Sequence, residues 1–277
     1  MTQPGPRRFA PLKQGAGQTR NLPKLKGVVF DVDGTLCKPQ NHMFVEMRDV
    51  LGIPKSIDIL DHIYSLSPAS KQEEAMESIR AIERRNMSEQ IAQPGLAALM
   101  AYLDSRSVRK GICTRNFDGP VTHLLGKFLP SSVFEPIITR DFRPPKPDPA
   151  GILFIARSWG LSRPLSDMSR GRAEELKGLV RASDEGAGVR RGALAEPEEG
   201  GNDHGDGEEI GDARGLIMVG DSIDDMAAGR RAGAATVLLV NSANEHLAEH
   251  EDTDLVIRSL DELVDILEDG FVGRVIS

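Results

Sequence analysis

Aromatic residues are scarce in this sequence, at 4% of 277 positions. Hydrophobic residues still make up 39% of the chain, which is enough for one sizeable core and a small second module. The low aromatic content indicates that part of the chain packs against nothing. A surplus of basic residues is also missing, because the net charge is −8. A general nucleic-acid binder would present a basic face, so we expect no nucleic-acid partner.

Cysteine and long apolar runs are equally rare. Cys37 and Cys113 are the only cysteines; they could pair in principle, but two cysteines make no disulfide framework. This usage fits a reducing compartment, and we expect a cytoplasmic location. No apolar run approaches the roughly 20 residues of a membrane helix, and no secretory signal is visible at the start. We therefore expect no membrane association.

Acidic residues are absent before Asp31. The basic residues of this segment are Arg7, Arg8, Lys13, Arg20, Lys24 and Lys26. An acid-free basic start could be a mitochondrial targeting segment. The helix-breaking residues Pro4, Pro6, Pro11, Gly15 and Gly17 would spoil the amphipathic helix that such a signal needs. We therefore interpret residues 1–25 as a disordered basic tail, with a mitochondrial location as the alternative.

Short apolar runs alternate with segments of helical periodicity along the rest of the chain. Strands are expected at 26–30, 110–113, 136–139, 216–219, 236–240 and 255–257. Helices are expected at 96–103, 121–128, 149–159, 224–232 and 260–267. This alternation predicts an α/β fold, with a Rossmann-like parallel sheet and helices on both faces. Ligands of such sheets bind at the carboxyl ends of the strands.

Two segments interrupt the alternation. Residues 40–92 have a helical pattern, with a capping box expected at Ser70 and Glu73, and we interpret them as a helical cap inserted between 26–39 and 93–277 of the core. Residues 163–214 are rich in acids and glycine, so we expect a disordered insertion. It could be a regulatory or partner-binding segment, or merely a tolerated surface insertion.

Two carboxylates leave the first expected strand in the run Phe30-Asp31-Val32-Asp33-Gly34. Their mutual repulsion in a buried setting would be costly, and a divalent cation would relieve it. Glycine at position 34 allows the chain to turn away sharply. This order of residues predicts a metal-assisted site at the end of the strand.

A second acidic group follows the strand at 216–219. Asp221 lies at the strand end and Asp225 in the first helical turn, so both can face one point. Such oxygen ligands suit Mg²⁺. The alternative is that Ser222 caps the helix, while the helix dipole favours the nearby acids, and we assign Asp224 to that role alone.

Two further polar residues fall at the same edge of the sheet. Thr114 follows the strand at 110–113, and its hydroxyl can donate to a phosphate oxygen. Lys146 lies in a loop stiffened by prolines, which could hold its ammonium group in place. Taken singly, Thr114 would be interpreted as an ordinary loop residue and Lys146 as a surface lysine.

These groups, taken in chain order, resemble the four motifs of the haloacid dehalogenase-like hydrolases. The motifs are Asp31-Val32-Asp33-Gly34-Thr35, Thr114 at a strand end, Lys146-Pro147-Asp148-Pro149, and Gly220-Asp221-Ser222 with Asp225. The resemblance runs from about Gly27 to Val240, without residues 163–214. The cap is similar to that of subfamily I, which includes phosphoglycolate phosphatases, and the whole chain resembles a fungal-type member. The cap is short for the family, at about fifty residues.

The resemblance implies a role for each matching residue. Asp31 would attack phosphorus and form an aspartyl-phosphate, and Asp33 would act as general acid and then base. Thr114 and Lys146 would steady the charge of the transferred group. Asp31, the Asp33 carbonyl and Asp221 would bind Mg²⁺, with Asp225 close by. True dehalogenases lack the second aspartate, so Asp33 favours phosphate ester hydrolysis.

The substrate is expected to be a small phosphorylated metabolite, because a closing cap must exclude water. Arg115 and Asn116 follow Thr114 directly, and we assign them to substrate binding, with Arg115 as a clamp for a second anionic group. We expect a monomer or a weak dimer. Two alternatives stay open: a phosphomutase of the same fold, and a non-catalytic binding module in which the acidic insertion does the binding.

Overall fold

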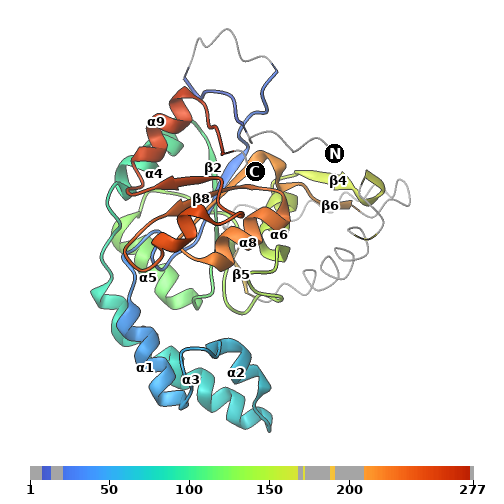
Figure 1. Cartoon of the computed structure of the whole chain (residues 1–277). Coiled ribbons are helices and arrows are strands. Elements are labelled where there is room, and N and C mark those ends of the chain that lie inside the picture. Colours follow the sequence, from blue (N-terminus) through green and yellow to red (C-terminus); the bar gives the residue numbers. More distant parts are fainter. Residues whose placement is uncertain (1–7, 14–20, 168–170, 172–187, 191–208, 275–277) are drawn as a thin grey trace.

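A seven-stranded sheet runs through the larger part of the protein in this computed structural model, which describes residues 8–13, 21–167, 171, 188–190 and 209–274 (Figure 1). The strand order is β5-β3-β2-β1-β7-β8-β9, and every neighbouring pair is parallel except β3 with the edge strand β5. The strands are β1 (Gly27–Phe30), β2 (Arg109–Cys113), β3 (Ile137–Ile138), β5 (Val189–Arg190), β7 (Leu216–Gly220), β8 (Ala235–Leu239) and β9 (Leu255–Ile257). The predicted α/β fold with a parallel sheet is confirmed.

Helices cover both faces of this sheet. Within β1, Val28 and Phe30 belong to one hydrophobic cluster and Val29 belongs to the other. The first cluster includes α4 (Leu96–Ser105), α5 (Asp118–Phe128) and α9 (Glu262–Asp269), and the second includes α6 (Ala150–Ser158) and α8 (Ile223–Ala232). Strands buried on both faces have continuous apolar runs. For this reason the six parallel strands begin and end within one residue of the positions that the sequence predicts.

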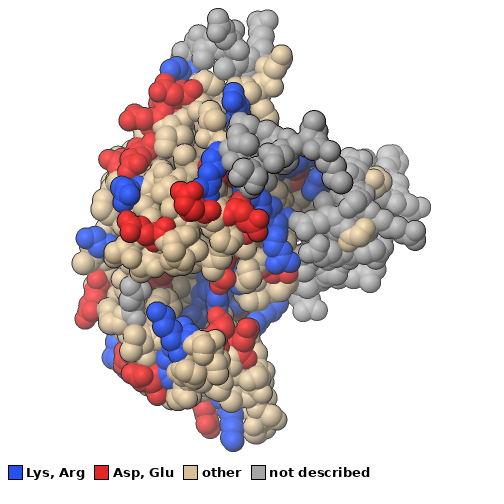
Figure 2. All heavy atoms as spheres, viewed as in Figure 1, with Lys and Arg blue, Asp and Glu red and all other residues tan. Residues whose placement is uncertain are grey.

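The segment predicted as a helical cap contains α1 (Asn41–Leu51), α2 (Ile59–Ser65) and α3 (Ala69–Asn86), followed by the short 3-10 helix η1 (Met87–Glu89). Its apolar side chains form a separate cluster around Met47, Ile63 and Ile79. Phe117 of the core is a member of this cluster, so the core reaches into the cap. The surface is hollowed where cap and core meet, and basic side chains are visible in the hollow (Figure 2).

The predicted capping box of Ser70 and Glu73 is wrong. Helix α3 begins at Ala69, after an extended Pro68, and no side chain caps it. Proline has a fixed φ and no N–H, so it can precede the first turn of a helix that starts two residues earlier than the box requires. Glu73 instead pairs with Arg80 on the cap surface, with 2.9 Å between the charged atoms.

Part of the predicted basic tail is ordered. Phe9 is 3% exposed, its ring centroid lies 5.6 Å from that of Phe271, and its N–H donates to the Phe271 carbonyl at 3.0 Å. Leu25 is also buried. The prediction of disorder is therefore wrong for residues 8–13 and 21–25, because these apolar anchors stabilise the segment against the core. Residues 1–7 and 14–20 lie outside the described residues.

Several residues within the predicted disordered insertion at 163–214 also belong to the folded structure. Strand β4 (Ser162–Pro164) pairs antiparallel with β6 (Glu209–Gly211), and β5 joins the edge of the main sheet. Leu165 and Ile210 are buried in the cluster on the α6 and α8 face. Residues 168–170, 172–187 and 191–208 lie outside the described residues. The acidic composition concealed these few apolar anchors, whose partners are distant in sequence.

The remaining short elements are the 3-10 helices η2 (Leu165–Asp167), η3 (Ala213–Gly215) and η4 (Glu245–Glu249). None of the helices in the described part of the chain combines the length and the apolar character that crossing a bilayer demands.

Candidate active site

Asp31 and Asp33 leave the carboxyl end of β1 and have different partners. The Asp31 N–H donates to the carbonyl of Val219 at 3.0 Å, and its carboxylate accepts from Lys146 Nζ at 2.7 Å. The Asp33 carboxylate accepts from Asn116 Nδ2 at 3.0 Å and from Cys37 Sγ at 3.4 Å. The two acids predicted from one motif are thus held by separate groups, so they can perform separate roles.

Gly34 permits this arrangement. Its φ is +81°, in the left-handed region that side-chain-bearing residues rarely adopt. A Cβ atom at this position would also overlap the carboxylate of Asp221, which comes from the end of β7. The turn predicted at this glycine therefore has a second physical reason: it leaves room for Asp221 beside Asp31.

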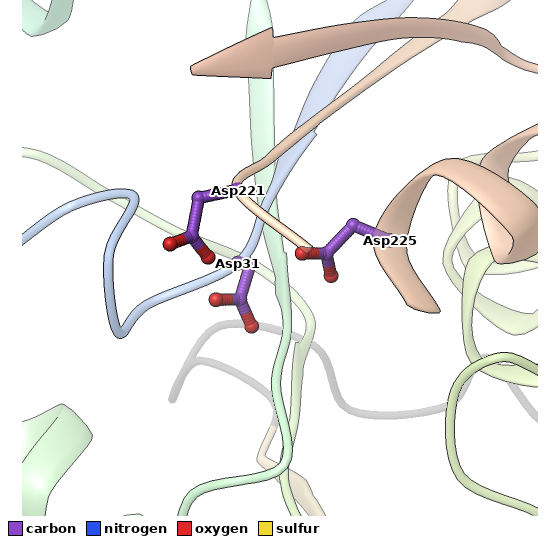
Figure 3. Close-up of side chains that lie close together, drawn as sticks. All are labelled: Asp31, Asp221 and Asp225. Carbon is purple, nitrogen blue, oxygen red and sulfur yellow. The ribbon is translucent and has the colours of Figure 1, made fainter. Parts of the chain in front are cut away.

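Asp31, Asp221 and Asp225 point toward one another at the ends of β1 and β7 (Figure 3). One carboxylate oxygen of each lies within 4.8 Å of the others. Burial raises the pKa of Asp31 to about 7; Lys146 opposes this shift and Asp225 adds to it. Burial, with Asp31 next, raises the pKa of Asp221 to about 8. Three crowded carboxylates, two of which have raised pKa values, form a donor set that a hard divalent cation would stabilise.

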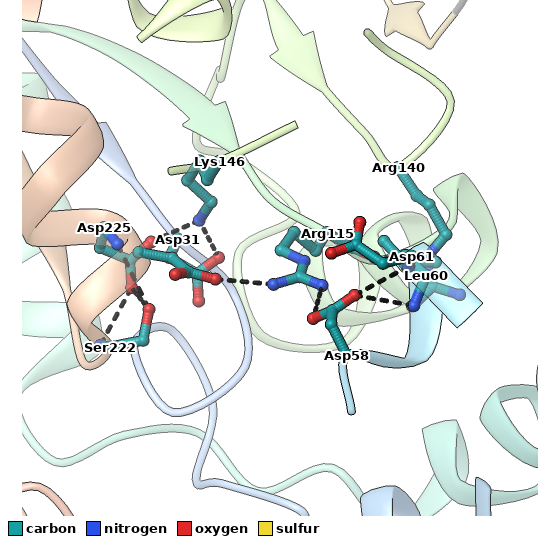
Figure 4. A network of polar contacts seen from close by, with 10 residues as sticks. Asp31, Asp58, Leu60, Asp61, Arg115, Arg140, Lys146, Ser222 and Asp225 are labelled. Atoms are coloured by element: carbon teal, nitrogen blue, oxygen red, sulfur yellow. Dashed lines mark hydrogen bonds and ion pairs between the residues drawn. The ribbon is translucent and has the colours of Figure 1, made fainter. Parts of the chain in front are cut away.

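Lys146 links two members of this cluster. It is buried, and its ammonium group contacts both Asp31 and Asp225 (Figure 4). These carboxylates raise the pKa of Lys146 against the effect of burial, so the side chain stays charged. Asp225 also accepts from Ser222 Oγ at 2.6 Å and completes a capping box at the start of α8. Asp225 therefore both caps the helix and belongs to the carboxylate cluster.

Thr114 follows β2, as the sequence predicts, and is buried. Its Oγ1 accepts from the backbone N–H of Asn116 at 3.2 Å, which leaves its own proton for another acceptor. Thr114 is not among the residues that line the cavity described next. Of the two residues after it, Asn116 contacts Asp33 and Arg115 points toward the cap.

A cavity of about 290 Å³ lies between core and cap. Its core side includes Asp31, Asp33, Arg115, Asn116, Arg140, Lys146, Asp221, Ser222 and Asp224. Its other side includes Pro39 before the cap and Phe44, Met47, Arg48, Asp58, Ile59 and Leu60 of the cap. Asp31, Asp33, Asp221, the lysine and both predicted substrate-binding residues thus border one small space of a size suited to a metabolite, whereas the predicted Asp225 does not line it.

Arg115 pairs with carboxylates on both sides of the cavity. Its Nη2 lies 2.5 Å from Asp58 at the start of α2 (Figure 4), and its Nη1 lies 2.6 Å from Asp224 of α8. Asp224 therefore does more than stabilise a helix dipole, which corrects that prediction. Because two carboxylates already neutralise Arg115, an anionic substrate group would have to displace one of them.

Two more arginines of the core contact the cap. Arg140 pairs with Glu83 of α3 at 2.8 Å, and both side chains are buried. The guanidinium of Arg143 lies 3.4 Å from the ring centroid of Tyr64 of α2. The sequence does not indicate these pairs, because their members lie more than fifty residues apart in separate segments.

The sequence analysis also did not identify two asparagines near Asp221. Asn244 Nδ2 donates to the Asp221 carbonyl at 2.6 Å, and Asn241 Nδ2 donates to its carboxylate at 3.4 Å. Both follow the carboxyl end of β8, where polar residues of a parallel sheet meet. That position was the signal that could have identified them.

Comparison with known proteins places this arrangement among hydrolases. Residues 206–263 match a family model described as HAD-hydrolase-like. An uncharacterised hydrolase of Saccharomyces cerevisiae is 36% identical over 254 residues, which cover 90% of this chain and 94% of the relative. A haloacid dehalogenase-like hydrolase domain-containing protein of Arabidopsis thaliana is 30% identical over 263 residues, covering 90% and 86%.

Solved structures share the fold. A hydrolase from Pseudomonas syringae superposes with a TM-score of 0.56 at 20% identity, covering 88% of this chain and 98% of that one. At this identity the similarity concerns the architecture of core and cap.

Proposed function

This chain belongs to the haloacid dehalogenase-like hydrolases, and we propose that it is a magnesium-dependent phosphatase acting on a small phosphorylated metabolite. One observation carries the proposal. Asp31 lies in a cavity between core and cap, with Lys146 at 2.7 Å and the Asp221 and Asp225 carboxylates beside it. Asp33, held by Asn116, borders the same cavity.

The donor set fits a magnesium ion. Asp31 and Asp221 offer carboxylate oxygens, with Asp225 within reach, and Mg²⁺ prefers such ligands in small number. The Asp33 carboxylate is bound to Asn116, so the Asp33 contribution would come from its backbone carbonyl. When bound, Mg²⁺ would offset the negative charge of carboxylates and phosphate, so that an anionic nucleophile can approach an anionic ester.

In the first step, a carboxylate oxygen of Asp31 forms a bond to phosphorus and the bond from phosphorus to the ester oxygen breaks. Asp33 gives its proton to the departing oxygen. Burial raises the pKa of Asp33, which favours the protonated form that this role requires. Lys146 holds Asp31 in place and balances its charge, and the Thr114 hydroxyl can donate to a phosphate oxygen.

In the second step, a water molecule attacks phosphorus and gives its proton to the Asp33 carboxylate. The bond between Asp31 and phosphorus breaks, and inorganic phosphate leaves. Asp33 ends protonated and Asp31 ends as a carboxylate, so both return to their starting forms. The cap residues over the cavity limit the entry of other water molecules.

The experiment compares wild type, Asp31→Asn and, as a control, the exposed α9 variant Asp265→Asn, with p-nitrophenyl phosphate and a panel of phosphorylated metabolites. We expect Asp31→Asn to lose turnover with its melting transition intact, and Asp265→Asn to match wild type. Chelation should abolish activity and Mg²⁺ should restore it. Substantial turnover by a clean Asp31→Asn preparation, or by verified metal-free enzyme, would contradict the mechanism.

The same panel tests the alternatives. Transfer of phosphate to a sugar rather than to water would indicate a phosphomutase, and no turnover of any ester would indicate a binding module. The cytoplasmic location, the monomeric or weakly dimeric state and the lack of a nucleic-acid partner stay predictions.

A further inference from the structure

The basic side chains of the cavity differ in whether a carboxylate already neutralises them. Four basic residues line the described cavity: Lys146, Arg115 and Arg140 from the core, and Arg48 from the cap. The first three are engaged with carboxylates of the protein, as described above. A distal anionic group of a substrate would therefore have to displace a carboxylate at Arg115 or Arg140.

Arg48 has no such partner among the described residues. Its Nη1 donates to the carbonyl of Phe44, one turn earlier in α1, at 3.2 Å. Its Nε is buried and has no hydrogen-bond partner in the described structure. A guanidinium has five N–H donors, so this single bond leaves most of its capacity for a ligand.

The other arginines of the cap are different. Arg80 pairs with Glu73 at 2.9 Å, Arg84 pairs with Glu77 at 2.5 Å, and Arg85 pairs with Glu46. None of the residues in these ion pairs lines the cavity. Arg48 is thus distinguished both by its position and by its uncompensated charge.

The surroundings of Arg48 strengthen its attraction for an anion. Phe44, Met47, Ile59 and Leu60 line the same side of the cavity, and Met47 is fully buried. An apolar wall has a lower effective dielectric constant than water, so a charge beside it interacts more strongly with an opposite charge. The same wall can contact a short carbon chain, and about 290 Å³ limits the ligand to a small molecule.

We propose that Arg48 binds a second anionic group of the substrate, which makes small phosphate esters with a distal carboxylate or phosphate the preferred substrates. The phosphoryl group would face Asp31, a short apolar segment would contact the cap, and the distal anion would accept hydrogen bonds from Arg48. Arg48 takes the role that the sequence suggested for Arg115. This inference rests on the proposed phosphatase function.

The kinetic test uses three esters with the same three-carbon spacer: propyl phosphate, 4-(phosphonooxy)butanoate and 3-phosphonopropyl phosphate, whose phosphonate stands in for a distal phosphate. The measured quantity is kcat/KM for each anionic ester divided by kcat/KM for propyl phosphate, with Mg²⁺ present. We expect a ratio of about ten or more in wild type for at least one anionic ester, because one hydrogen bond to a charged group contributes enough free energy for a change of that size. The larger ratio identifies the distal group as carboxylate or phosphate.

The variants are Arg48→Met, which keeps the length without the charge, Arg48→Lys, which keeps the charge, and the control Arg84→Met. The ratio should fall close to one in Arg48→Met, stay partly raised in Arg48→Lys and keep its wild-type value in Arg84→Met. A wild-type ratio near one overturns the assignment, and so does an unchanged ratio in Arg48→Met. Arg48→Lys, the smaller change, provides the test if Arg48→Met does not fold.

A binding measurement separates this inference from the proposed activity. Calorimetric titration of Asp31→Asn, with and without Arg48→Met, gives the affinities for the same esters without turnover. We expect the anionic ester to bind about tenfold tighter than propyl phosphate only when Arg48 is present. Equal affinities in the Asp31→Asn enzyme overturn the role of Arg48, whereas tight binding in an enzyme that hydrolyses no ester would contradict only the phosphatase.

Discussion

Replacing Lys146 by methionine tests the charge balance of the site most directly. The lysine side chain is 3% exposed, and its ammonium group contacts Asp31 at 2.7 Å as well as Asp225. Methionine has nearly the same length but no charge. The variant therefore leaves three crowded carboxylates, those of Asp31, Asp221 and Asp225, without a cation.

The expected loss of stability follows from burial. Removing one partner of a buried ion pair lowers the free energy of unfolding by about 3–5 kcal/mol. Proton uptake limits this loss, because the pKa values of Asp31 and Asp221 are already about 7 and 8 with the lysine present. An acid whose pKa is raised by folding binds more protons when folded, so stability falls as the pH rises. The loss in Lys146→Met should thus be larger at pH 8 than at pH 6.

Denaturation curves at both pH values, first without metal and then with Mg²⁺, measure this effect. Added Mg²⁺ should restore stability to Lys146→Met more than to wild type, because the ion supplies the missing positive charge. Activity should still fall about a hundredfold or more, since the lysine steadies charge at the reacting group.

Lys110 provides a matched control. It is also buried, it pairs with Asp104, and it lies near the start of β2, at the other end of the strand from Thr114. Lys110→Met should lose stability without any response to Mg²⁺ and without a change in kcat. The reasoning is refuted if Lys146→Met keeps wild-type stability at pH 8, or if both variants respond equally to Mg²⁺.

Two further predictions concern contacts away from the carboxylate cluster. Burial raises the pKa of Glu83 from 4.5 to about 7 despite its ion pair with Arg140. The folded protein therefore binds a proton at Glu83 more tightly than the unfolded chain does. As the pH rises from about 5 to 8, the free energy of unfolding of wild type should fall by up to about 3 kcal/mol relative to that of Glu83→Gln. Denaturation curves of both proteins across this pH range measure the difference in stability. If wild type becomes more stable relative to the variant as the pH rises, the ion pair outweighs burial. Phe9→Ala should lower the free energy of unfolding by about 3–5 kcal/mol, because Phe9 packs against Phe271 in the core. A loss well under 1 kcal/mol would mean that the N-terminal segment does not pack in solution.

The sequence alone determined the central sheet and the edge at which the site lies. Strands buried on both faces must be apolar throughout, so runs such as Val28-Val29-Phe30 could be recognised without tertiary information. Asp31 follows such a run directly, and Asp221 follows another after Gly220. Parallel strands end at a common edge, which is why two acids far apart in sequence could be predicted to meet.

Only the tertiary structure determined which apolar residues of the polar segments are buried in the core. Phe9 and Ile210 lie in stretches whose overall composition indicates disorder, and each is buried against elements far away in sequence. Composition averages over a window of residues. A single side chain that finds a site on the core can order its segment, and no average reveals it.

The choice of ion-pair partners was likewise made only by the fold. Arg115 pairs with Asp58 and Asp224, while Arg48, equally basic in the sequence, lines the cavity without a carboxylate partner among the described residues. The sequence gives the charge of each side chain, but which ion pairs form depends on distances of a few ångströms. Those distances are set by how the cap packs on the core, through contacts such as Phe117 in the cap cluster.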